Sequence, residues 1–427
     1  MTAIITEKFR QHNAEQFFES FSEAANSTYY LFIGKSLPYT TGTTGGSDSS
    51  PPTPADSVSG EFYNWDAMLA AKKIATTDVS FALTRVNFSN GTIYDMYDDT
   101  ISSSNTTTSG ASSLYAGNFY FITSTNNVYK VLDNNNGVAY SGSEPSNTGT
   151  TPFASGGYIL KYMYNVTASE ATKFLTTDYM PVSTDTTVSA AATDGKIESL
   201  VVTAGSGYTN GTYYAPVFGD GTSQGTSSGA IVRITISGGA IASFGLTAGT
   251  DTTIHAGGAA YTFGNVNLSN VFSDAALSSS ASVGSGTGGA VRVVISPKGG
   301  HGKDAVKELG GHFVITNTTL AQAEGDDLTV ANDFRQVGLV VDPFNYGTTT
   351  VASSDTARLT YVVKMSSSSG TFDVDEEITQ ATTGAVGRVV EWDSSRSLLY
   401  YSQERFSTYG TAATTQSYTA FSGTNTI

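Results

Sequence analysis

The sequence lacks cysteine altogether and has few charged residues. The absence of Cys in 427 residues excludes a disulfide-stapled secreted scaffold and structural zinc held by thiolates. Charged residues are 14%, against about 25% in typical globular chains, and hydrophobic residues are 39%. There are only 21 Lys plus Arg against 37 Asp plus Glu, a net charge of −16. This balance disfavours binding to nucleic acid or to an anionic membrane, because both require clustered cations.

Long hydrophobic runs are also missing. The first residues, MTAIITEKFRQHNAEQFF, are polar and charged and contain no apolar signal core. No apolar run approaches the roughly 18–20 residues of a membrane helix. The sequence therefore predicts a protein without a signal peptide or membrane span, made in a cytoplasm.

Glycine and aromatic residues are abundant. The chain has 45 Gly, 24 Tyr and 22 Phe, together with many Ser, Thr and Asn. A disordered acidic chain would have far more charge and few aromatic residues, so this class is excluded. The β-prone runs separated by Gly-rich turns predict a mainly β (α+β) fold: a β-sandwich-like scaffold with a few short helices and an inserted domain.

The segment 6–25 is the clearest predicted helix. Thr6 can cap its first turn, and Glu7 suits the positive end of the helix dipole. Its apolar residues recur every three or four positions, and we expect this stripe to pack on a sheet. The stripe comprises Ala14, Phe17, Phe18, Phe21 and Ala25. The spacing of Trp65, Met68, Leu69 and Lys72 predicts a second helix over residues 61–74.

Changes of composition divide the chain into four predicted segments. Residues 1–190 form the N-terminal part of the scaffold domain, and residues 191–296 are an inserted β-domain rich in Gly, Ser and Thr. Residues 297–350 continue the scaffold, and residues 351–427 form a C-terminal β region. Further predicted elements are strands at 28–33, 79–88, 118–124, 127–133, 157–166, 313–317, 334–341, 357–364, 372–379 and 387–401, short helices at 169–178 and 304–309, and a hairpin turn at 134–137.

The inserted segment contains a weak internal repeat. Tyr208 precedes the strand 229–237 (GAIVRITIS), and Tyr261 precedes the strand 289–296 (GAVRVVIS). Each unit is a turn with a Tyr, a Gly-rich connection and a strand with one Arg. The repeat predicts duplicated small β-units.

No catalytic or metal-binding motif stands out. His301 and His312 are eleven residues apart, whereas zinc pairs usually lie three to five apart, so we expect a turn His and a strand-start His. No G-x-S-x-G occurs on a strand-to-helix turn. The Gly-rich fragments at 205–207 and 219–221 are expected to be β-turns, because neither continues as a phosphate loop.

Three acidic clusters offer the one enzymatic alternative. They lie at residues 95–99, 324–327 and 373–377. A pair of carboxylates about 5–10 Å apart can hydrolyse glycosides, which leaves a tail-associated glycosidase possible. Because the clusters are short and flanked by Gly or Thr, we expect them to be solvated loops instead.

Several strings, in order, resemble one viral family. They are IITEKFRQHNAEQFFES, YYLFIGKSLPY and PPTPADSV near the N-terminus, then GYILKYMYNVT (157–167) and DFRQVGLVVDP (333–343). Together they resemble the baseplate wedge subunit, the eighth gene product, of T-even-type contractile-tailed phages, in a branch like that of cyanophages. The resemblance covers about residues 1–180 and 297–345. Residues 195–296 have no counterpart that can be aligned.

The resemblance implies a structural and non-enzymatic protein. Members of this family form a homodimer and contact other baseplate wedge subunits, and they bring no catalytic residue, cofactor or metal to carry over. We therefore expect a virion protein of the tail baseplate, assembled in the bacterial host cytoplasm, that does not bind nucleic acid or membrane. The interface candidates are Phe18, Phe21, Tyr29, Tyr30, Phe334 and Arg335. The alternative is a receptor- or carbohydrate-binding tail protein that uses the loops of 195–296.

Overall fold

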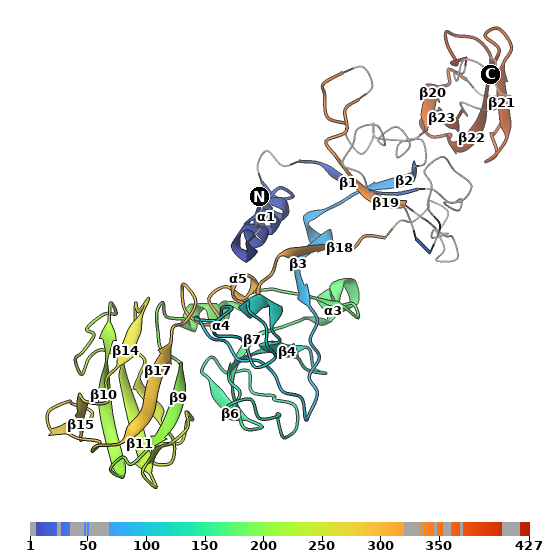
Figure 1. The fold of residues 1–427 in the computed structure, drawn as a ribbon. Coiled ribbons are helices and arrows are strands. Elements are labelled where there is room, and N and C mark those ends of the chain that lie inside the picture. Colours follow the sequence, from blue (N-terminus) through green and yellow to red (C-terminus); the bar gives the residue numbers. More distant parts are fainter. Residues whose placement is uncertain are drawn as a thin grey trace. The chain divides into compact units, whose positions relative to one another are not determined.

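The computed structural model describes residues 6–23, 27–34, 47, 49–50, 68–319, 334, 336–345, 348–352, 360–367, 370–403 and 419–427 (Figure 1). Residue contacts divide the chain into two units. Unit 1 comprises Met1–Glu23 and Thr76–Asn317, and unit 2 comprises Ala24–Ala75 and Thr318–Ile427. Antiparallel sheets dominate the described residues, which confirms the predicted mainly β class. None of the helices in those residues is long and apolar enough to cross a lipid bilayer.

Helix α1 (Glu7–Glu19) confirms the predicted N-terminal helix. The side chain of Thr6 accepts a hydrogen bond from the backbone N–H of Phe9 at 3.2 Å, which caps the first turn. The Phe18 ring stacks on Phe81 of β3 (Val79–Thr84), with ring centroids 4.3 Å apart. The apolar stripe therefore packs on a sheet, as predicted. The helix ends at Glu19, well before residue 25, and turns follow over residues 20–23.

Two small sheets form the remaining scaffold part of unit 1. The first has the strand order β18-β3-β8, and the second has the order β4-β5-β7-β6. The further strands are β4 (Tyr120–Ile122), β5 (Asn127–Asp133), β6 (Phe153–Ser155), β7 (Tyr158–Asn165), β8 (Tyr179–Pro181) and β18 (Phe313–Thr316). These confirm the strands predicted at 118–124, 127–133, 157–166 and 313–317. The predicted turn at 134–137 exists, but β5 pairs with β4 and β7, so it does not close a hairpin.

Short helices accompany these sheets. Helix α3 (Ala168–Phe174) contacts β8, and α4 (Thr186–Ala191) contacts β7. Helix α5 (Ala305–Leu309) follows a Gly-rich turn, begins at the cap Asp304 and ends at Gly310, whose φ of 85° lies in the left-handed region. Two single-turn 3-10 helices, η3 (Thr76–Asp78) and η4 (Leu114–Ala116), also belong to this unit. Helices α3 and α5 confirm the predictions at 169–178 and 304–309.

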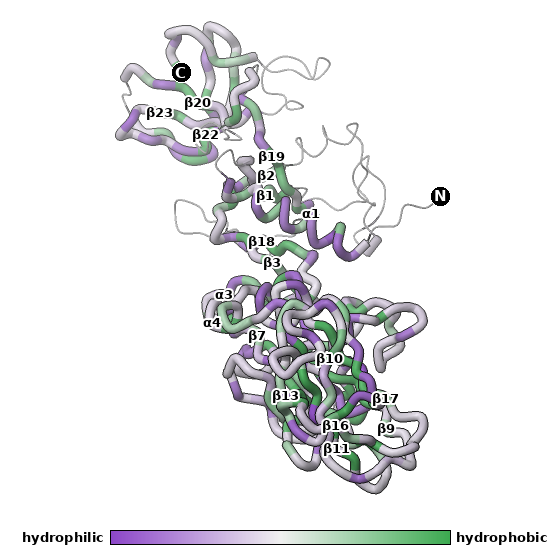
Figure 2. Tube along the Cα trace, turned by 90° about the vertical axis from the view of Figure 1, so that its left-hand side faces the viewer, coloured by the Kyte–Doolittle hydropathy of each residue, from purple (hydrophilic) through white to green (hydrophobic). Residues whose placement is uncertain are grey.

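Nine strands between Ser199 and Val294 form two sheets around one core. The larger sheet has the order β12-β11-β10-β15-β16, with β13 paired to β11 and β14 to β10, and the smaller one pairs β17 with β9. Figure 2 shows hydrophobic residues along the central strands. The strands are β9 (Ser199–Ser206), β10 (Gly211–Gly219), β11 (Ile231–Ser237), β12 (Ala240–Ile241), β13 (Thr253–Ala256), β14 (Gly264–Val266), β15 (Val271–Phe272), β16 (Ser280–Ala281) and β17 (Thr287–Val294).

The two tyrosines of the repeat make reciprocal contacts between these strands. The Tyr208 hydroxyl accepts a hydrogen bond from the N–H of Gly289 at 2.9 Å, and the Tyr261 hydroxyl accepts one from the N–H of Ala230 at 3.1 Å. Each tyrosine thus binds the strand that belongs to the other repeat. A Cβ placed at Gly221 would lie 2.3 Å from the Tyr261 ring, so the glycine is needed for this close packing.

Unit 2 contains two sheets in its described residues. One has the order β19-β1-β2, with β1 (Tyr29–Gly34) between β2 (Met68–Lys73) and β19 (Gln336–Val341). The other has the order β20-β23-β22-β21. Its strands are β20 (Tyr361–Lys364), β21 (Glu377–Gln380), β22 (Ala385–Asp393) and β23 (Leu398–Ser402).

Three element predictions fail wholly or in part in unit 2. The strand predicted at 372–379 begins only at Glu377, because residues 374–375 form a turn. Residues 68–73 are strand β2 rather than part of a helix over 61–74, because they pair with β1 from Tyr30 opposite Lys73 to Gly34 opposite Met68. Residues 61–67 lie outside the described residues. The single strand predicted at 387–401 is two strands, β22 and β23, joined by a turn in which Ser397 has a φ of 53°. Strand pairing overrode the helical pattern of residues 68–73, and the polar residues 394–397 form the turn that divides β22 from β23.

Candidate functional site

The predicted interface residues are mostly enclosed within their own units. Phe21 of the α1 segment and Tyr29 and Tyr30 of β1 are buried, while Phe18 is half-buried against Phe81. The buried rings serve the core of the chain and offer little surface to a neighbour. Their role at an interface stays a prediction.

The two remaining interface candidates immediately precede strand β19. Phe334 is half-buried, and Arg335 lies outside the described residues. Strand β19 itself begins at Gln336 and is the edge strand of its sheet in the described part of the chain. Next to these two candidates, the exposed side chains of β19 form a surface that a second protein could contact.

Strand β19 exposes a row of apolar side chains. Val337, Leu339 and Val341, which we call the β19 row, are 64%, 39% and 50% exposed. They alternate along the strand and so share one face of the sheet. Across the ladder they pair with Ile33, Leu31 and Tyr29 of β1. An apolar row on an edge strand is a surface that favours pairing with another chain.

Next in the chain, a turn adds two more exposed apolar side chains. Phe344 and Val351 form an isolated antiparallel bridge and are 60% and 42% exposed. Asp342, between them and the β19 row, accepts a hydrogen bond from the backbone N–H of Thr28 at 2.6 Å. This contact fixes the end of β19 against the start of β1.

A second feature, which was not predicted from the sequence, is a cluster of buried charged groups in unit 1. Three side chains form what we call the buried charge cluster: Lys130 of β5, His301 of the turn before α5, and Glu308 of α5. All three are almost fully excluded from solvent. The Lys130 Nζ atom lies 3.0 Å from Glu308 Oε2 and 2.9 Å from His301 Nδ1. It also lies 3.9 Å from the centroid of the Tyr97 ring, which is a cation–π distance.

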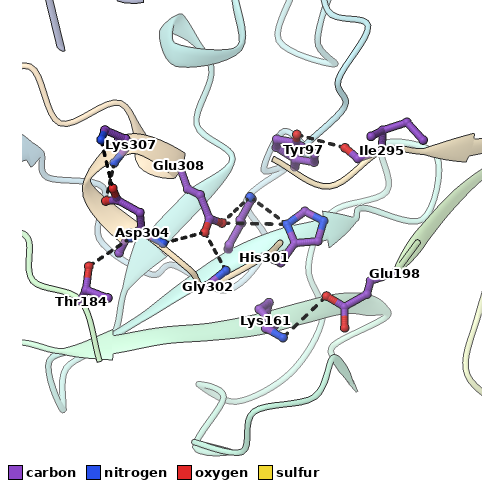
Figure 3. Close-up of polar contacts among 12 residues, drawn as sticks. Tyr97, Lys161, Thr184, Glu198, Ile295, His301, Gly302, Asp304, Lys307 and Glu308 are labelled. Carbon is purple, nitrogen blue, oxygen red and sulfur yellow. Dashed lines mark hydrogen bonds and ion pairs between the residues drawn. The ribbon is translucent and has the colours of Figure 1, made fainter. Parts of the chain in front are cut away.

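Backbone groups complete the environment of Glu308. Its Oε1 atom accepts hydrogen bonds from the N–H of Gly302 at 2.7 Å and of Asp304 at 3.3 Å (Figure 3). Such bonds offset the cost of burying a carboxylate. Burial lowers the pKa of Lys130 and of His301, and nearby cations lower that of His301 further. His301 is therefore neutral in the folded protein at ordinary pH.

Adjacent ion pairs join the inserted segment to the scaffold. Glu198, just before β9, lies 3.7 Å from Lys161 of β7 and 3.0 Å from Lys196. At the other end of the insert, the Tyr97 hydroxyl donates to the carbonyl of Ile295 at 3.1 Å, and Arg292 pairs with Asp98. These contacts lie where the chain enters and leaves the insert, so they anchor it at both ends. Lys161, Glu198 and Asp98 are buried, whereas Lys196 and Arg292 are partly exposed.

The acidic clusters differ in burial and in their partners. Asp95 and Asp98 are buried, which corrects the expectation of solvated loops there. Asp95 accepts hydrogen bonds from Ser109 and Asn118, and Asp98 binds Arg292, so both carboxylates are engaged in structural contacts. The cluster at 373–377 is exposed, as expected. Residues 324–327 lie outside the described part of the chain.

The histidines are scattered. His12 and His255 are exposed, His301 lies in a buried turn, and His312 immediately precedes β18, as predicted for the last two. Within the described ranges, no three residues of the His, Cys, Asp and Glu types are grouped so that they could hold a metal ion.

The sequence contained a weak signal for the buried charge cluster. Lys130 and Lys161 are single cations within the strings NVYKVLD and GYILKYMYNV, whose neighbouring positions are apolar on both sides of the strand. Such a strand is buried on both faces, so its lysine requires a buried partner. The partners Glu308 and Glu198 are far away in the sequence, and nothing in their local pattern identifies them.

Comparison with known proteins bears on the N-terminal third of the chain. Residues 3–139 match the family model Phage-Gp8, described as bacteriophage T4 Gp8, whereas no curated protein matches the chain. The matched range ends before residues 140–180 and 297–345, where the resemblance rests on the sequence strings alone. The match supports a structural role in the phage baseplate and a place in the virion tail. Over residues 3–139 the chain is therefore similar to the baseplate wedge subunit Gp8, and the resemblance found in the sequence is confirmed there.

Proposed function

We propose that this protein is a wedge subunit of the baseplate of a contractile phage tail, where it holds neighbouring subunits together and rearranges on host contact. The observation that carries the proposal is the match of residues 3–139 to the Gp8 family. The low charge and many aromatic residues suit broad protein interfaces, where Lys and Glu are depleted and Tyr and Phe enriched. The protein would be assembled in the host cytoplasm and would have no catalytic activity.

We further propose that the β19 row is the centre of a homodimer interface. An isologous interface requires a patch that is complementary to itself, and two antiparallel copies of an apolar edge strand meet this requirement. The described residues leave β19 with an open edge, and its exposed row contains no charge that would oppose a second copy. Pairing around Leu339 would bring the two rows together. Leu339 lies in the strand predicted at 334–341, which begins with the interface candidates Phe334 and Arg335.

A single charge tests this interface. Val337→Lys introduces a cation at the most exposed position of the β19 row, where the monomer has little packing to lose. We expect the variant to be monomeric at concentrations where the unchanged chain is a dimer, as measured by analytical ultracentrifugation. Val390→Lys is the matched control, because Val390 is 42% exposed but lies on β22.

Two outcomes would contradict the dimer. One is a Val337→Lys variant that dimerises as tightly as the Val390→Lys control. The other is a purified unchanged chain that sediments as a monomer at all concentrations. A map of the tail baseplate in which this chain contacts no other wedge subunit would overturn the wider proposal.

A further inference from the structure

The C-terminal sheet of unit 2 contains a cavity that the proposed structural role does not use. Its volume is about 520 Å³, within the range of about 300–1,000 Å³ that is usual for small-molecule sites. One wall comes from residues 363–367 and 370–372, and the other from the last residues of the chain, 421–427. We call it the C-terminal cavity. It lies within one unit and is formed by described residues.

Buried groups fix the walls of the cavity. The side chain of Gln380, which is buried, donates a hydrogen bond to the carbonyl of Asn425 at 3.2 Å and accepts one from the N–H of Ser422 at 3.0 Å. Phe372 packs edge-to-face on Trp392, with centroids 5.2 Å apart, and Phe421 packs in the same way on Tyr401 at 4.7 Å. The two wall rings are therefore held in place by the core of the sheet.

The lining combines an apolar part with many neutral hydrogen-bonding groups. The apolar side chains include Val363, Met365, Phe372 and Phe421. The polar ones are hydroxyl and amide groups, among them Ser366, Thr371, Thr424 and Asn425. A ligand that fits such a lining has an apolar face and several hydroxyl groups.

The charge of the lining excludes other ligand classes. Lys364 and Glu376 are the two charged side chains of the lining, and they balance each other. The Lys364 ammonium donates to the carbonyl of Arg396, and Glu376 accepts from the N–H of Asp373 at 3.1 Å. A phosphorylated ligand requires clustered cations, and a fatty acyl chain requires a predominantly apolar lining. Neither requirement is met.

We propose that the C-terminal cavity binds an uncharged saccharide. The C–H face of a sugar ring would pack on Phe372 or Phe421, and its hydroxyl groups would bond to the Ser, Thr and Asn side chains of the walls. This site is separate from the inserted segment and from the β19 row. If no saccharide binds, the proposed baseplate role still stands, because oligomeric state and saccharide binding are measured independently.

The test uses the full chain and saturation-transfer NMR. The probes are glucose, galactose, rhamnose, N-acetylglucosamine, lactose and maltose, with glucuronate and glucose 6-phosphate as charged counterparts. We expect at least one neutral sugar to bind with a dissociation constant of about 10 mM or lower, with saturation passing from aromatic protons. The charged counterparts should bind more weakly.

A matched pair of substitutions locates the binding. Thr424→Trp places a large side chain at an exposed position of the cavity wall, and Thr382→Trp makes the same change in an exposed turn that does not line the cavity. We expect Thr424→Trp to weaken binding by roughly tenfold or more and Thr382→Trp to leave it unchanged. The proposal is overturned if no neutral sugar binds, if the charged sugars bind more tightly, or if both variants bind like the unchanged chain.

Discussion

At the scale of single residues, the interior of unit 1 contains buried charged side chains, although only 14% of the residues in the chain are charged. Lys130, His301 and Glu308 are in contact, with Lys130 on β5 and the other two in the turn and helix of residues 301–309. The isolated lysine in an apolar strand could be noticed in the sequence, but its partner could not. Pairings between residues nearly 180 positions apart leave no trace in local periodicity.

Removing the cation of this cluster should destabilise unit 1. Lys130→Met leaves the buried carboxylate of Glu308 without its ammonium partner, and we expect the free energy of unfolding to fall by about 3–5 kcal/mol. Urea denaturation followed by near-UV circular dichroism measures the loss. Lys303→Met, at an exposed lysine, is the matched control.

A second variant separates lost packing from lost charge pairing. Lys130→Met combined with Glu308→Leu removes both charges and should recover much of the stability, because no charge is then buried alone. The interpretation is wrong if Lys130→Met unfolds at the same urea concentration as Lys303→Met.

His301 should make the stability of unit 1 depend on pH. Burial lowers the pKa of its folded state well below the ordinary value of about 6.5, so the unfolded state binds more protons below that pH. Stability should therefore fall as the pH is lowered from about 6.5 to 5. The groups facing the ring are Lys130, Lys161, Lys196, Glu308 and Tyr97.

The measurement compares variants, because Asp133 also has a folded-state pKa near this range. Burial raises the pKa of Asp133 to about 6, and this carboxyl shifts stability in the opposite direction. The difference in unfolding free energy between the unchanged chain and His301→Gln isolates the histidine, and His12→Gln serves as the exposed control. A difference that is constant from pH 6.5 to 5 would contradict the role of His301.

At the scale of elements, the sequence predicted strands well where apolar residues cluster between turns and failed where pairing decides. The strings at 118–124, 127–133 and 157–166 became β4, β5 and β7. The apolar residues around Ala70 and Ala71 have helical spacing, but residues 68–73 pair with β1 and form strand β2. The partner of a strand is supplied by the whole fold, and for that reason periodicity alone could not identify β2.

The reciprocal tyrosines offer a test of how the insert is held together. Tyr208→Phe and Tyr261→Phe each leave a backbone N–H without its acceptor, at Gly289 and Ala230. We expect each variant to lose about 1–3 kcal/mol of stability and to exchange that one amide hydrogen faster, as measured by hydrogen exchange. Tyr214→Phe, at a half-buried tyrosine of β10, is the control.

The positions at which amide hydrogen exchange accelerates test whether the two tyrosine contacts are reciprocal. If the contacts are reciprocal, Tyr208→Phe accelerates exchange at Gly289, and Tyr261→Phe accelerates exchange at Ala230. Equal acceleration throughout the insert in both variants would instead mean that the hydroxyl groups act only through global stability.

At the scale of the whole molecule, the order of segments in the sequence differs from their grouping in the structure. The composition breaks near residues 190 and 296 are visible in the sequence, because the Gly, Ser and Thr content changes there. The exchange of segments between the two units has no such signal. Residues 24–75 separate α1 from β3 in the chain, yet they belong to the other unit. The match to the Gp8 family over residues 3–139 likewise includes parts of both units.

The pairing of β1 with β19 has a consequence for synthesis on the ribosome. Tyr29 lies opposite Val341, so the two strands are separated by about 300 residues of translation. At about 5–20 residues per second, β1 waits roughly 15–60 s for its partner to emerge. During that interval all of unit 1 becomes available for folding, while an apolar strand of unit 2 has one unsatisfied edge. The time at which β19 is synthesised therefore sets how long β1 of the nascent protein is open to mispairing with other nascent chains on the same messenger RNA.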